Sequence, residues 1–228
     1  MKRAGKGSGE EVATAVILAG GANKRFPTLK GFIKIGETTI LERNLALLRT
    51  LFPEVMVSAN TPELYFRLGA PLVGDVLPSR GPMAGIHAAL LNAKGDAVFA
   101  VACDMPFIAP ALITALVERH RKATQQEPVD ATVPRCKGAL QPLFGIYSKE
   151  VLPVLEEHIV SDRCSLKPFL DEVRTCIIDE AAIQALDSEG RSFVNINTVE
   201  DYRAVLGPGA PERNAALPQG AREGPHRL

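Results

Sequence analysis

The strongest constraint on the fold is a regular alternation between short apolar runs and longer segments with helical periodicity. The runs are hydrophobic at nearly every position, as in 97–103, whereas a half-exposed strand would alternate apolar and polar residues. Strands that are buried on both faces are typical of parallel sheets, which need crossover helices between successive strands. The sequence therefore predicts an α/β protein, a three-layer α/β/α sandwich around a mostly parallel, Rossmann-like sheet.

The predicted strands are the apolar runs themselves, and helical segments lie between most of them. We expect strands over residues 13–18, 54–59, 97–103, 130–133, 143–147, 174–178 and 193–196. The segment 40–51 repeats leucine at three- or four-residue spacing, and Thr39 with Glu42 forms a capping box at its start. Further helices are expected over about 83–92 and 110–121, after Ser148 and Ser165, and after Thr198, which Asp201 would help to cap.

The two ends of the chain differ in composition from the rest. Residues 207–228 contain four Gly and four Pro and almost no large apolar side chain, and residues 1–11 are also rich in glycine. Such composition is typical of tails that do not pack. Between them we find no internal repeat and no second linker. We expect a flexible tail over 1–11, one domain over 12–206 and a disordered tail over 207–228.

Composition argues against several classes of function. The 26 Lys and Arg residues balance 26 Asp and Glu residues, so no net charge attracts the chain to nucleic acid or to an anionic membrane. The longest apolar runs, 12–19 and 97–103, are shorter than the roughly 18 residues of a membrane span. The N-terminus lacks the apolar core of a secretion signal, and the four cysteines show no zinc-ligand spacing. We expect a cytoplasmic protein with reduced thiols.

The segment after the first predicted strand is rich in glycine and in cations. Gly20 and Gly21 are adjacent, and residues 12–36 include no acidic side chain. Two glycines let backbone N–H groups approach an anion, and nearby cations supply the charge that a polyphosphate needs. Those cations are Lys24, Arg25, Lys30 and Lys34. We interpret the segment as a cradle for a nucleoside triphosphate, although it is neither a Walker A loop nor a dinucleotide fingerprint. The alternative is a tight turn with a solvated basic face.

Asp104 directly follows the apolar run 97–103. Open α/β sheets bind ligands at the carboxyl ends of their strands, so this carboxylate would face the same crevice as the glycine loop. Magnesium needs only one or two protein carboxylates and completes its shell with phosphate oxygens and water. Asp104 is therefore our candidate metal ligand, and a turn residue before Pro106 is the alternative.

Asparagines end two other predicted strands. Asn60 follows the second strand, where its amide would hydrogen-bond a nucleobase or merely form a turn. Asn195 and Asn197 alternate along the predicted strand near 193–196 and so point to one face. They would support a metal or an acceptor phosphate, or cap the last helix.

Together these motifs resemble the nucleotidyltransferases that share a Leu-Ala-Gly-Gly-x-x-x-Arg…Lys signature, and within them the molybdenum cofactor guanylyltransferases. Residues 18–30 carry the signature, and Cys-Asp-Met-Pro-Phe at 103–107 resembles the magnesium motif of the family. Arg-Gly-Pro-Met-Ala-Gly at 80–85 and Phe-Val-Asn-Ile-Asn-Thr at 193–198 resemble two further family segments. The resemblance covers 12–206 and implies a sheet of the nucleotidyltransferase type.

The resemblance also implies roles for individual residues. Asp75 would read the guanine edge or the ribose, and Gly81 would let the chain close over the nucleotide. The implied catalytic residues are Arg25, Lys30 and Asp104, with Asp104 as the metal ligand. The implied GTP-binding residues are Leu18, Ala19, Gly20, Gly21, Lys30, Asn60, Asp75, Gly81 and Asp104. Asn195 and Asn197 would lie on the acceptor side.

The implied reaction is transfer of GMP from GTP to the molybdenum-molybdopterin cofactor, with Mg²⁺ as cofactor and pyrophosphate as the leaving product. The resemblance further implies transient contact with molybdenum-insertion or molybdoenzyme-maturation proteins, and with neither nucleic acid nor membrane. Two alternatives stay open. One is a cytidylyltransferase or sugar-phosphate nucleotidyltransferase on the same scaffold, and the other is a nucleotide-binding adaptor without turnover.

Overall fold

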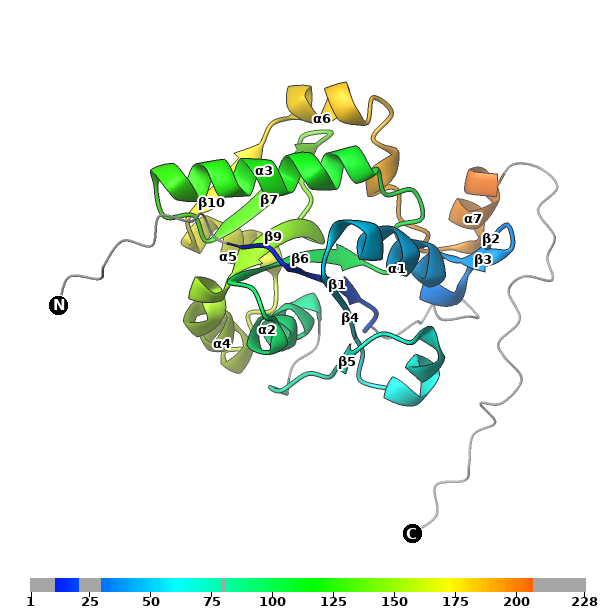
Figure 1. The fold of residues 1–228 in the computed structure, drawn as a ribbon, viewed down its shortest axis with the longest axis horizontal. Helices are drawn as coiled ribbons and strands as arrows, with labels where there is room; N and C mark the ends of the chain where they lie inside the picture. Colours follow the sequence, from blue (N-terminus) through cyan, green and yellow to red (C-terminus); the bar gives the residue numbers. More distant parts are fainter. Residues whose placement is uncertain (1–10, 21–29, 79–80, 207–228) are drawn as a thin grey trace, which may run out of the picture.

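The computed structural model describes residues 11–20, 30–78 and 81–206, and a single large β-sheet lies at its centre (Figure 1). From one edge to the other the strands are β10 (Thr175–Ile178), β7 (Ala131–Cys136), β9 (Phe144–Ser148), β6 (Ala97–Ala102), β1 (Thr14–Leu18), β4 (Glu54–Ser58) and β5 (Leu72–Val73). The short strand β8 (Ala139–Leu140) pairs with β7.

Parallel pairing dominates the sheet. β1 runs parallel to both neighbours, and Leu18 at its end pairs with Ser58 of β4 on one side and Ala102 of β6 on the other. β5 is parallel to β4, and β10 is parallel to β7. Only β9 and β8 introduce antiparallel pairs within the described sheet, β9 with β6 and β7, and β8 with β7. The predicted mostly parallel α/β sheet is confirmed.

Helices cover both faces of the sheet (Figure 1). One layer contains α1 (Ile40–Leu51), α3 (Pro110–Gln126) and α6 (Glu180–Leu186), and the other contains α2 (Pro82–Asn92), α4 (Leu152–Val160) and α5 (Leu166–Glu172). The central strand shows why both layers are needed. In β1, Ala15 and Ile17 pack into the first layer, whereas Val16 and Leu18 pack into the second. The predicted three-layer sandwich is therefore confirmed.

A small extra unit stands beside the carboxyl edge of the sheet. The strands β2 (Lys34–Ile35) and β3 (Thr38–Thr39) form an antiparallel hairpin, and α7 (Val199–Leu206) lies next to it in Figure 1. Ile33 and Ile40 pack here against Ile196 and Tyr202 in a cluster of their own. This cluster joins the segment before α7 to the start of α1, near the end of β1.

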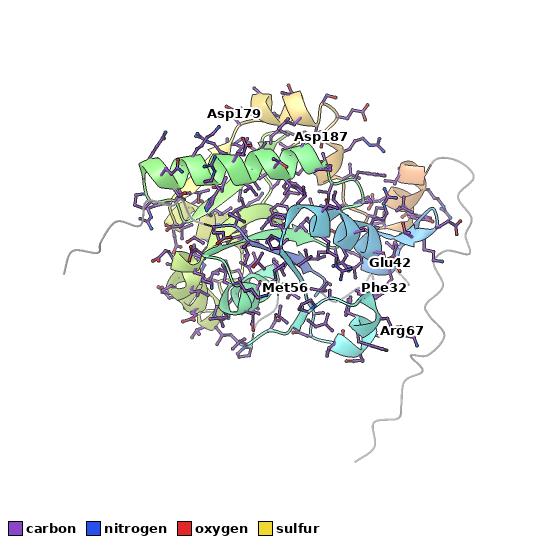
Figure 2. The ribbon with its side chains drawn as sticks, viewed as in Figure 1. Phe32, Glu42, Met56, Arg67, Asp179 and Asp187 are labelled. Carbon is purple, nitrogen blue, oxygen red and sulfur yellow. The ribbon has the colours of Figure 1, made fainter. Side chains whose placement is uncertain are left out.

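The capping box at the start of α1 is present as predicted, and the helix occupies the predicted residues. Glu42 N donates to Thr39 Oγ1 at 3.1 Å, and Thr39 N donates to Glu42 Oε2 at 2.8 Å. The bond from Thr39 N, and then a second bond from Thr39 Oγ1 to the same carboxylate oxygen at 2.8 Å, lower the pKa of Glu42. Figure 2 shows Glu42 at this end of α1. Local chemistry alone therefore sets this boundary.

The predicted strand over 193–196 is wrong. A 3₁₀ helix, Arg191–Phe193, leads instead into irregular backbone. Asp187 explains the turn, because its carboxylate accepts from Arg191 N at 3.0 Å and from Ser192 N at 2.7 Å. Ile196 N then donates to a loop carbonyl, that of Asp104, so its bond is not part of a strand ladder.

The sequence analysis also missed helix α6. It buries only Ile183, so it lacks the apolar stripe that marks the equally short α5, which buries Leu166, Phe169 and Leu170. Its start is marked by Asp179, whose side chain accepts from Ala182 N at 2.9 Å (Figure 2). Ile183 is the one buried residue of this helix, and its side chain belongs to the core of the first layer.

Residues 1–10 and 207–228, which make up nearly all of the two predicted tails, lie outside the described residues. Within the part of the chain that the structure describes, no helix combines the length and the apolar character needed to cross a bilayer.

An ion pair joins the starts of β7 and β10 and makes their pairing dependent on pH. Asp130 accepts from Arg174 N at 2.9 Å, from Arg174 Nε at 2.8 Å and from a second guanidinium nitrogen. Burial raises the pKa of Asp130, but these hydrogen bonds outweigh it and the pKa is lowered. A carboxyl with a lowered folded pKa stabilises the fold above its unfolded pKa, and this contribution is lost as pH falls through the folded value.

We expect Asp130→Asn to lower the free energy of unfolding by about 1–2 kcal/mol at pH 7, because Arg174 is half exposed and water screens part of the interaction. Urea unfolding at several pH values measures this, with exposed Asp171→Asn as the control. The difference from wild type should shrink below about pH 4. A difference that stays constant from pH 7 to pH 3 would contradict the assignment.

Candidate active site

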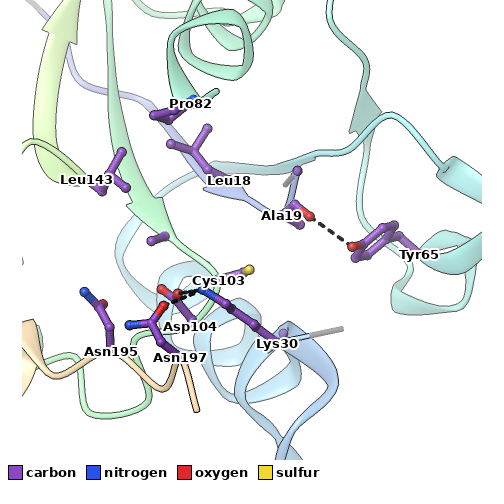
Figure 3. Close-up of a pocket in the computed structure, with 13 residues that line it drawn as sticks. Leu18, Ala19, Lys30, Tyr65, Pro82, Cys103, Asp104, Leu143, Asn195 and Asn197 are labelled. Atoms are coloured by element: carbon purple, nitrogen blue, oxygen red, sulfur yellow. Dashed lines mark hydrogen bonds and ion pairs between the residues drawn. The ribbon is translucent and has the colours of Figure 1, made fainter. Parts of the chain in front are cut away.

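A pocket of about 320 Å³ opens where β1 and β6 end (Figure 3). Leu18, Ala19 and Gly20 form one wall, and Cys103 and Asp104, which follow β6, form the floor. The remaining lining residues are Lys30, Gly31, Tyr65, Pro82, Ala102, Leu143, Asn195 and Asn197. The pocket thus lies at the carboxyl edge of the sheet, where open α/β folds bind their ligands.

Lys30, Asp104 and Asn197 meet in this pocket although they are far apart in the sequence (Figure 3). Lys30 Nζ lies 3.1 Å from Asp104 Oδ2 and donates to Asn197 Oδ1 at 2.5 Å. The side chains of Lys30 and Asp104 are only 28% and 14% exposed, so water screens their attraction incompletely. An ammonium group has three N–H donors, and these two bonds leave one for a further acceptor.

Backbone hydrogen bonds place these residues together. Cys103 N donates to Leu18 O at 3.2 Å, which carries the pairing of β1 and β6 one residue past the strands. Asp104 comes next, and Ile196 N donates to Asp104 O at 3.0 Å. The two asparagines that flank Ile196 are thereby brought to the pocket.

The capping role expected before the last helix belongs to Thr198, not to the asparagine side chains. Asp201 N donates to Thr198 Oγ1 at 3.1 Å, and Asp201 Oδ2 accepts from Thr198 N and Asn197 N, both at 2.9 Å. The amide of Asn197 is left to bond Lys30. Asn195 lines the same pocket (Figure 3). Both asparagines therefore line the pocket, as expected, although the strand that was expected to carry them is absent from this described segment.

Asn60 and Asp75 form a pair beside the pocket but do not line it. Asn60 Nδ2 donates to Asp75 Oδ2 at 2.6 Å, and Asp75 N donates to Asn60 Oδ1 at 2.9 Å. They follow the neighbouring strands β4 and β5, which explains how they meet. The amide of Asn60 is thus engaged on both its atoms and orients the carboxylate of Asp75.

The two positions of the Gly-Pro-Met-Ala-Gly segment that hold glycine need it for different structural reasons. Gly81, just before α2, has φ of 128°, which residues with a Cβ rarely adopt. Gly85 lies within α2, where a Cβ would come within 2.6 Å of Ser58 Oγ. Gly85 is therefore required for α2 to pack against the sheet, and Gly81 for the turn that leads to Pro82 in the pocket wall.

Two of the expected site residues, Gly21 and Arg25, lie outside the described residues, as do Lys24 and Arg80. The structure adds lining residues that the sequence analysis did not single out, among them Tyr65, Cys103 and Leu143. Cys103 could have been inferred from its position beside Asp104. Tyr65 has no such signal, because it sits in a short irregular connection whose path depends on tertiary packing.

The oxygen atoms around Lys30 suit a hard divalent cation. Asp104 offers a carboxylate, and Asn197 offers an amide oxygen. In the described ranges no group of three or more His, Cys, Asp or Glu side chains could hold a metal ion. One carboxylate is nevertheless enough when phosphate oxygens and water complete the shell. The Lys30 ammonium group already bonds these two oxygens, which shows that the two oxygens can bind a positively charged group.

Comparison with known proteins places this chain in a family. The family model of the MobA-like NTP transferase domain matches residues 15–176. The chain belongs to the MobA-like NTP transferase family. The resemblance to nucleotidyltransferases that the motifs predicted is thereby confirmed.

Relatives within this MobA-like family cover most of the chain. A probable molybdenum cofactor guanylyltransferase from Pelotomaculum thermopropionicum is 38% identical over 189 residues, 83% of this chain and 89% of the relative. One from Peptoclostridium acidaminophilum is 34% identical over 193 residues, 83% and 86% of the two chains. The crystal structure of molybdopterin-guanine dinucleotide biosynthesis protein A from Archaeoglobus fulgidus shares the fold, with a TM-score of 0.75, 24% identity and coverage of 85% and 96%.

In this MobA-like transferase we expect the Cys103 thiol to be chemically inert. Burial, and then the neighbouring Asp104 carboxylate, raises the pKa of Cys103 to about 12. At pH 8 its thiolate fraction is then on the order of a thousandfold below that of an unfolded cysteine with a pKa near ~8.5. Iodoacetamide should alkylate Cys103 at least about a hundredfold more slowly in the native protein than in urea, as followed by peptide mass spectrometry. Equal rates in the two states would contradict the raised pKa of this thiol.

Proposed function

We propose that this protein transfers GMP from GTP to the terminal phosphate of the molybdenum-molybdopterin cofactor and releases pyrophosphate. The observation that supports this most is the meeting of Lys30, Asp104 and Asn197 beside the backbone of residues 18–20. A nucleoside triphosphate needs cations, N–H donors and a ligand for its divalent ion in one place. The choice of guanosine and of the acceptor follows the relatives, which are called molybdenum cofactor guanylyltransferases.

In this proposal the first loop holds the nucleotide. Leu18, Ala19, Gly20 and Gly21 would contact GTP through their backbone, and Arg25 would neutralise the triphosphate. Lys30 would join Arg25 there, because one of its three donors is unused by Asp104 and Asn197. The roles of residues 18–20 and Lys30 are supported by their place in the pocket lining. The roles of Gly21 and Arg25 are supported only by the sequence signature at 18–30.

The guanine would be read by Asp75. Guanine is the common base that presents two adjacent donors, N1 and N2, and a carboxylate can accept from both. The two hydrogen bonds between Asn60 and Asp75 hold that carboxylate in one orientation. Asn60 would thus contribute to GTP binding by orienting Asp75, and Gly81 by letting the chain turn into the pocket wall.

We infer that Asp104 holds the divalent ion, which we take to be Mg²⁺, with Asn195 and Asn197 on the acceptor side. When bound, the ion would supply neutralisation of charge at the α-phosphate. Lys30 and Arg25 would orient the triphosphate and balance the charge that remains. The acceptor phosphate is already an anion, so no side chain has to remove a proton, and alignment of the two substrates dominates catalysis.

The same proposal has consequences in the cell. The protein would act in the cytoplasm, and the product would pass to molybdenum-insertion or molybdoenzyme-maturation proteins through transient contacts. Its zero formal net charge offers no general attraction for nucleic acid or membranes, which agrees with a small-molecule substrate.

Pyrophosphate release from GTP, CTP, UTP and ATP, with and without a molybdopterin source, tests this function. We expect release only when GTP and the acceptor are both present. Release with CTP in place of GTP would instead identify a cytidylyltransferase. Tight nucleotide binding without any release would identify a non-catalytic adaptor.

We predict that Asp104→Ala abolishes metal-dependent turnover and leaves the fold intact, because a loop carboxylate contributes little to the core. Pyrophosphate release measures the loss, and circular dichroism checks the fold. Asp171→Ala, an exposed carboxylate on α5, is the matched control and should keep full activity. Normal turnover by the Asp104 variant would remove this residue from the mechanism.

Lys30→Ala should lose a charge-assisted contact worth roughly 1.5–3 kcal/mol, which lowers kcat/KM for GTP by about ten- to a hundredfold. Steady-state kinetics measures it, with Lys167→Ala on the exposed face of α5 as control. If Lys24→Ala is damaging and Lys30→Ala is silent, then Lys24 and not Lys30 serves the triphosphate.

A further inference from the structure

Tyr65 is held in place beside Ala19, just past the end of β1. It lies between two 3₁₀ helices, Pro62–Leu64 and Phe66–Leu68, and is only 3% exposed. Its backbone N donates to Pro62 O at 2.9 Å, and its ring lies 5.3 Å from that of Phe32 between centroids. The backbone bond and the contact with Phe32 together hold this side chain in place.

The hydroxyl of Tyr65 donates to the carbonyl oxygen of Ala19 at 3.0 Å (Figure 3). Ala19 N in turn donates to Ser58 O at 2.9 Å. Both backbone polar groups of Ala19 are thus bonded to β4 or to the segment that follows it. Burial, and then Cys103, raises the pKa of Tyr65 to about 12, so the hydroxyl stays protonated and remains a donor at neutral pH.

The bond from Tyr65 also determines where the next amide points. In a trans peptide the C=O and the following N–H point in opposite directions. Because the Ala19 carbonyl faces Tyr65, the Gly20 N–H faces away from it. In Figure 3 Tyr65 stands on one side of Ala19, and Leu143, Asp104 and Asn195 stand on the other. The Gly20 N–H is therefore presented to the body of the pocket.

Gly20 itself gives an independent indication that something approaches here. Its φ is not in the left-handed region, and no described atom lies within 4 Å of the place that a Cβ would take. The described fold therefore has no need of glycine at this position. A ligand that approaches the backbone closely would need it.

We propose that Tyr65 is a positioning residue that aims the Gly20 N–H at an acceptor oxygen of the bound nucleotide. This inference rests on the proposed function, because it needs a nucleotide in the pocket. It predicts that the Tyr65 hydroxyl, which donates to the Ala19 carbonyl, controls nucleotide affinity through the backbone.

The test compares Tyr65→Phe with Tyr147→Phe by calorimetric binding of GTP and by kinetics. Tyr147 is a matched control, because its buried hydroxyl also donates to a backbone carbonyl, that of Pro142, at 2.6 Å. Both variants should lower the urea midpoint, since each loses one buried hydrogen bond. Only Tyr65→Phe should raise the Kd and KM for GTP, by about two- to tenfold, while kcat changes less than about twofold.

Gly20→Ala provides the second arm. It should unfold at the wild-type urea concentration, because nothing described obstructs its Cβ, and bind GTP more weakly than wild type. Wild-type GTP affinity in either Tyr65→Phe or Gly20→Ala would overturn the proposal, as would an equal loss of affinity in Tyr147→Phe.

Competition with ATP and CTP then locates the acceptor oxygen. An equal loss of affinity for all nucleotides in Tyr65→Phe assigns it to a phosphate, and a loss confined to GTP assigns it to the guanine. Either pattern supports the proposal. A wild-type protein that binds no nucleotide would overturn the proposed function together with this inference, whereas normal wild-type binding with unaffected variants would overturn this inference alone.

Discussion

The parallel pairing of β1 with both β4 and β6 is the constraint on which the site depends. Because β1 is buried on both faces, it carries only apolar side chains and one hydrogen-bonded threonine, and the charged groups of this region stand beyond its carboxyl end. Register then puts the ends of the three strands side by side, with Leu18 between Ser58 and Ala102. Gly20, Tyr65 and Asp104 lie beyond the ends of these strands, and they line one pocket.

The electrostatics of that pocket follow from the same arrangement. The Lys30 ammonium group meets the oxygen atoms of Asp104 and Asn197 where the described sheet ends. Partial burial strengthens the attraction between Lys30 and Asp104. Lys30 donates hydrogen bonds to the same oxygens that would serve a divalent ion. The family assignment comes from the sequence match over residues 15–176, whereas the donor set is an arrangement of side chains in space, so the two are separate observations.

Local patterns predicted the elements that local chemistry controls. Helix α1 begins at the predicted residue because Thr39 and Glu42 cap it through neighbours three residues apart. The segment 193–196 fails for the opposite reason, since Asp187 turns the chain and Asp104 accepts the bond that a strand neighbour would have accepted. Helix α6 was missed because it buries a single side chain, Ile183, and so shows no apolar stripe.

By itself, the sequence determined the α/β class, the longer strands β1, β4, β6, β7, β9 and β10, and the candidates Gly20, Lys30 and Asp104, but it missed the two-residue strands β2, β3, β5 and β8. The features that it determined follow from periodicity and from short motifs, which need no knowledge of distant contacts. Only the tertiary structure decided that Asn197 reaches Lys30, that Asn60 engages Asp75, and that Tyr65 bonds Ala19. It also separated glycines that look alike in sequence, because Gly85 serves helix packing while Gly20 faces open space. These contacts join residues many positions apart, and the path of the chain between them is set by packing and not by local preference.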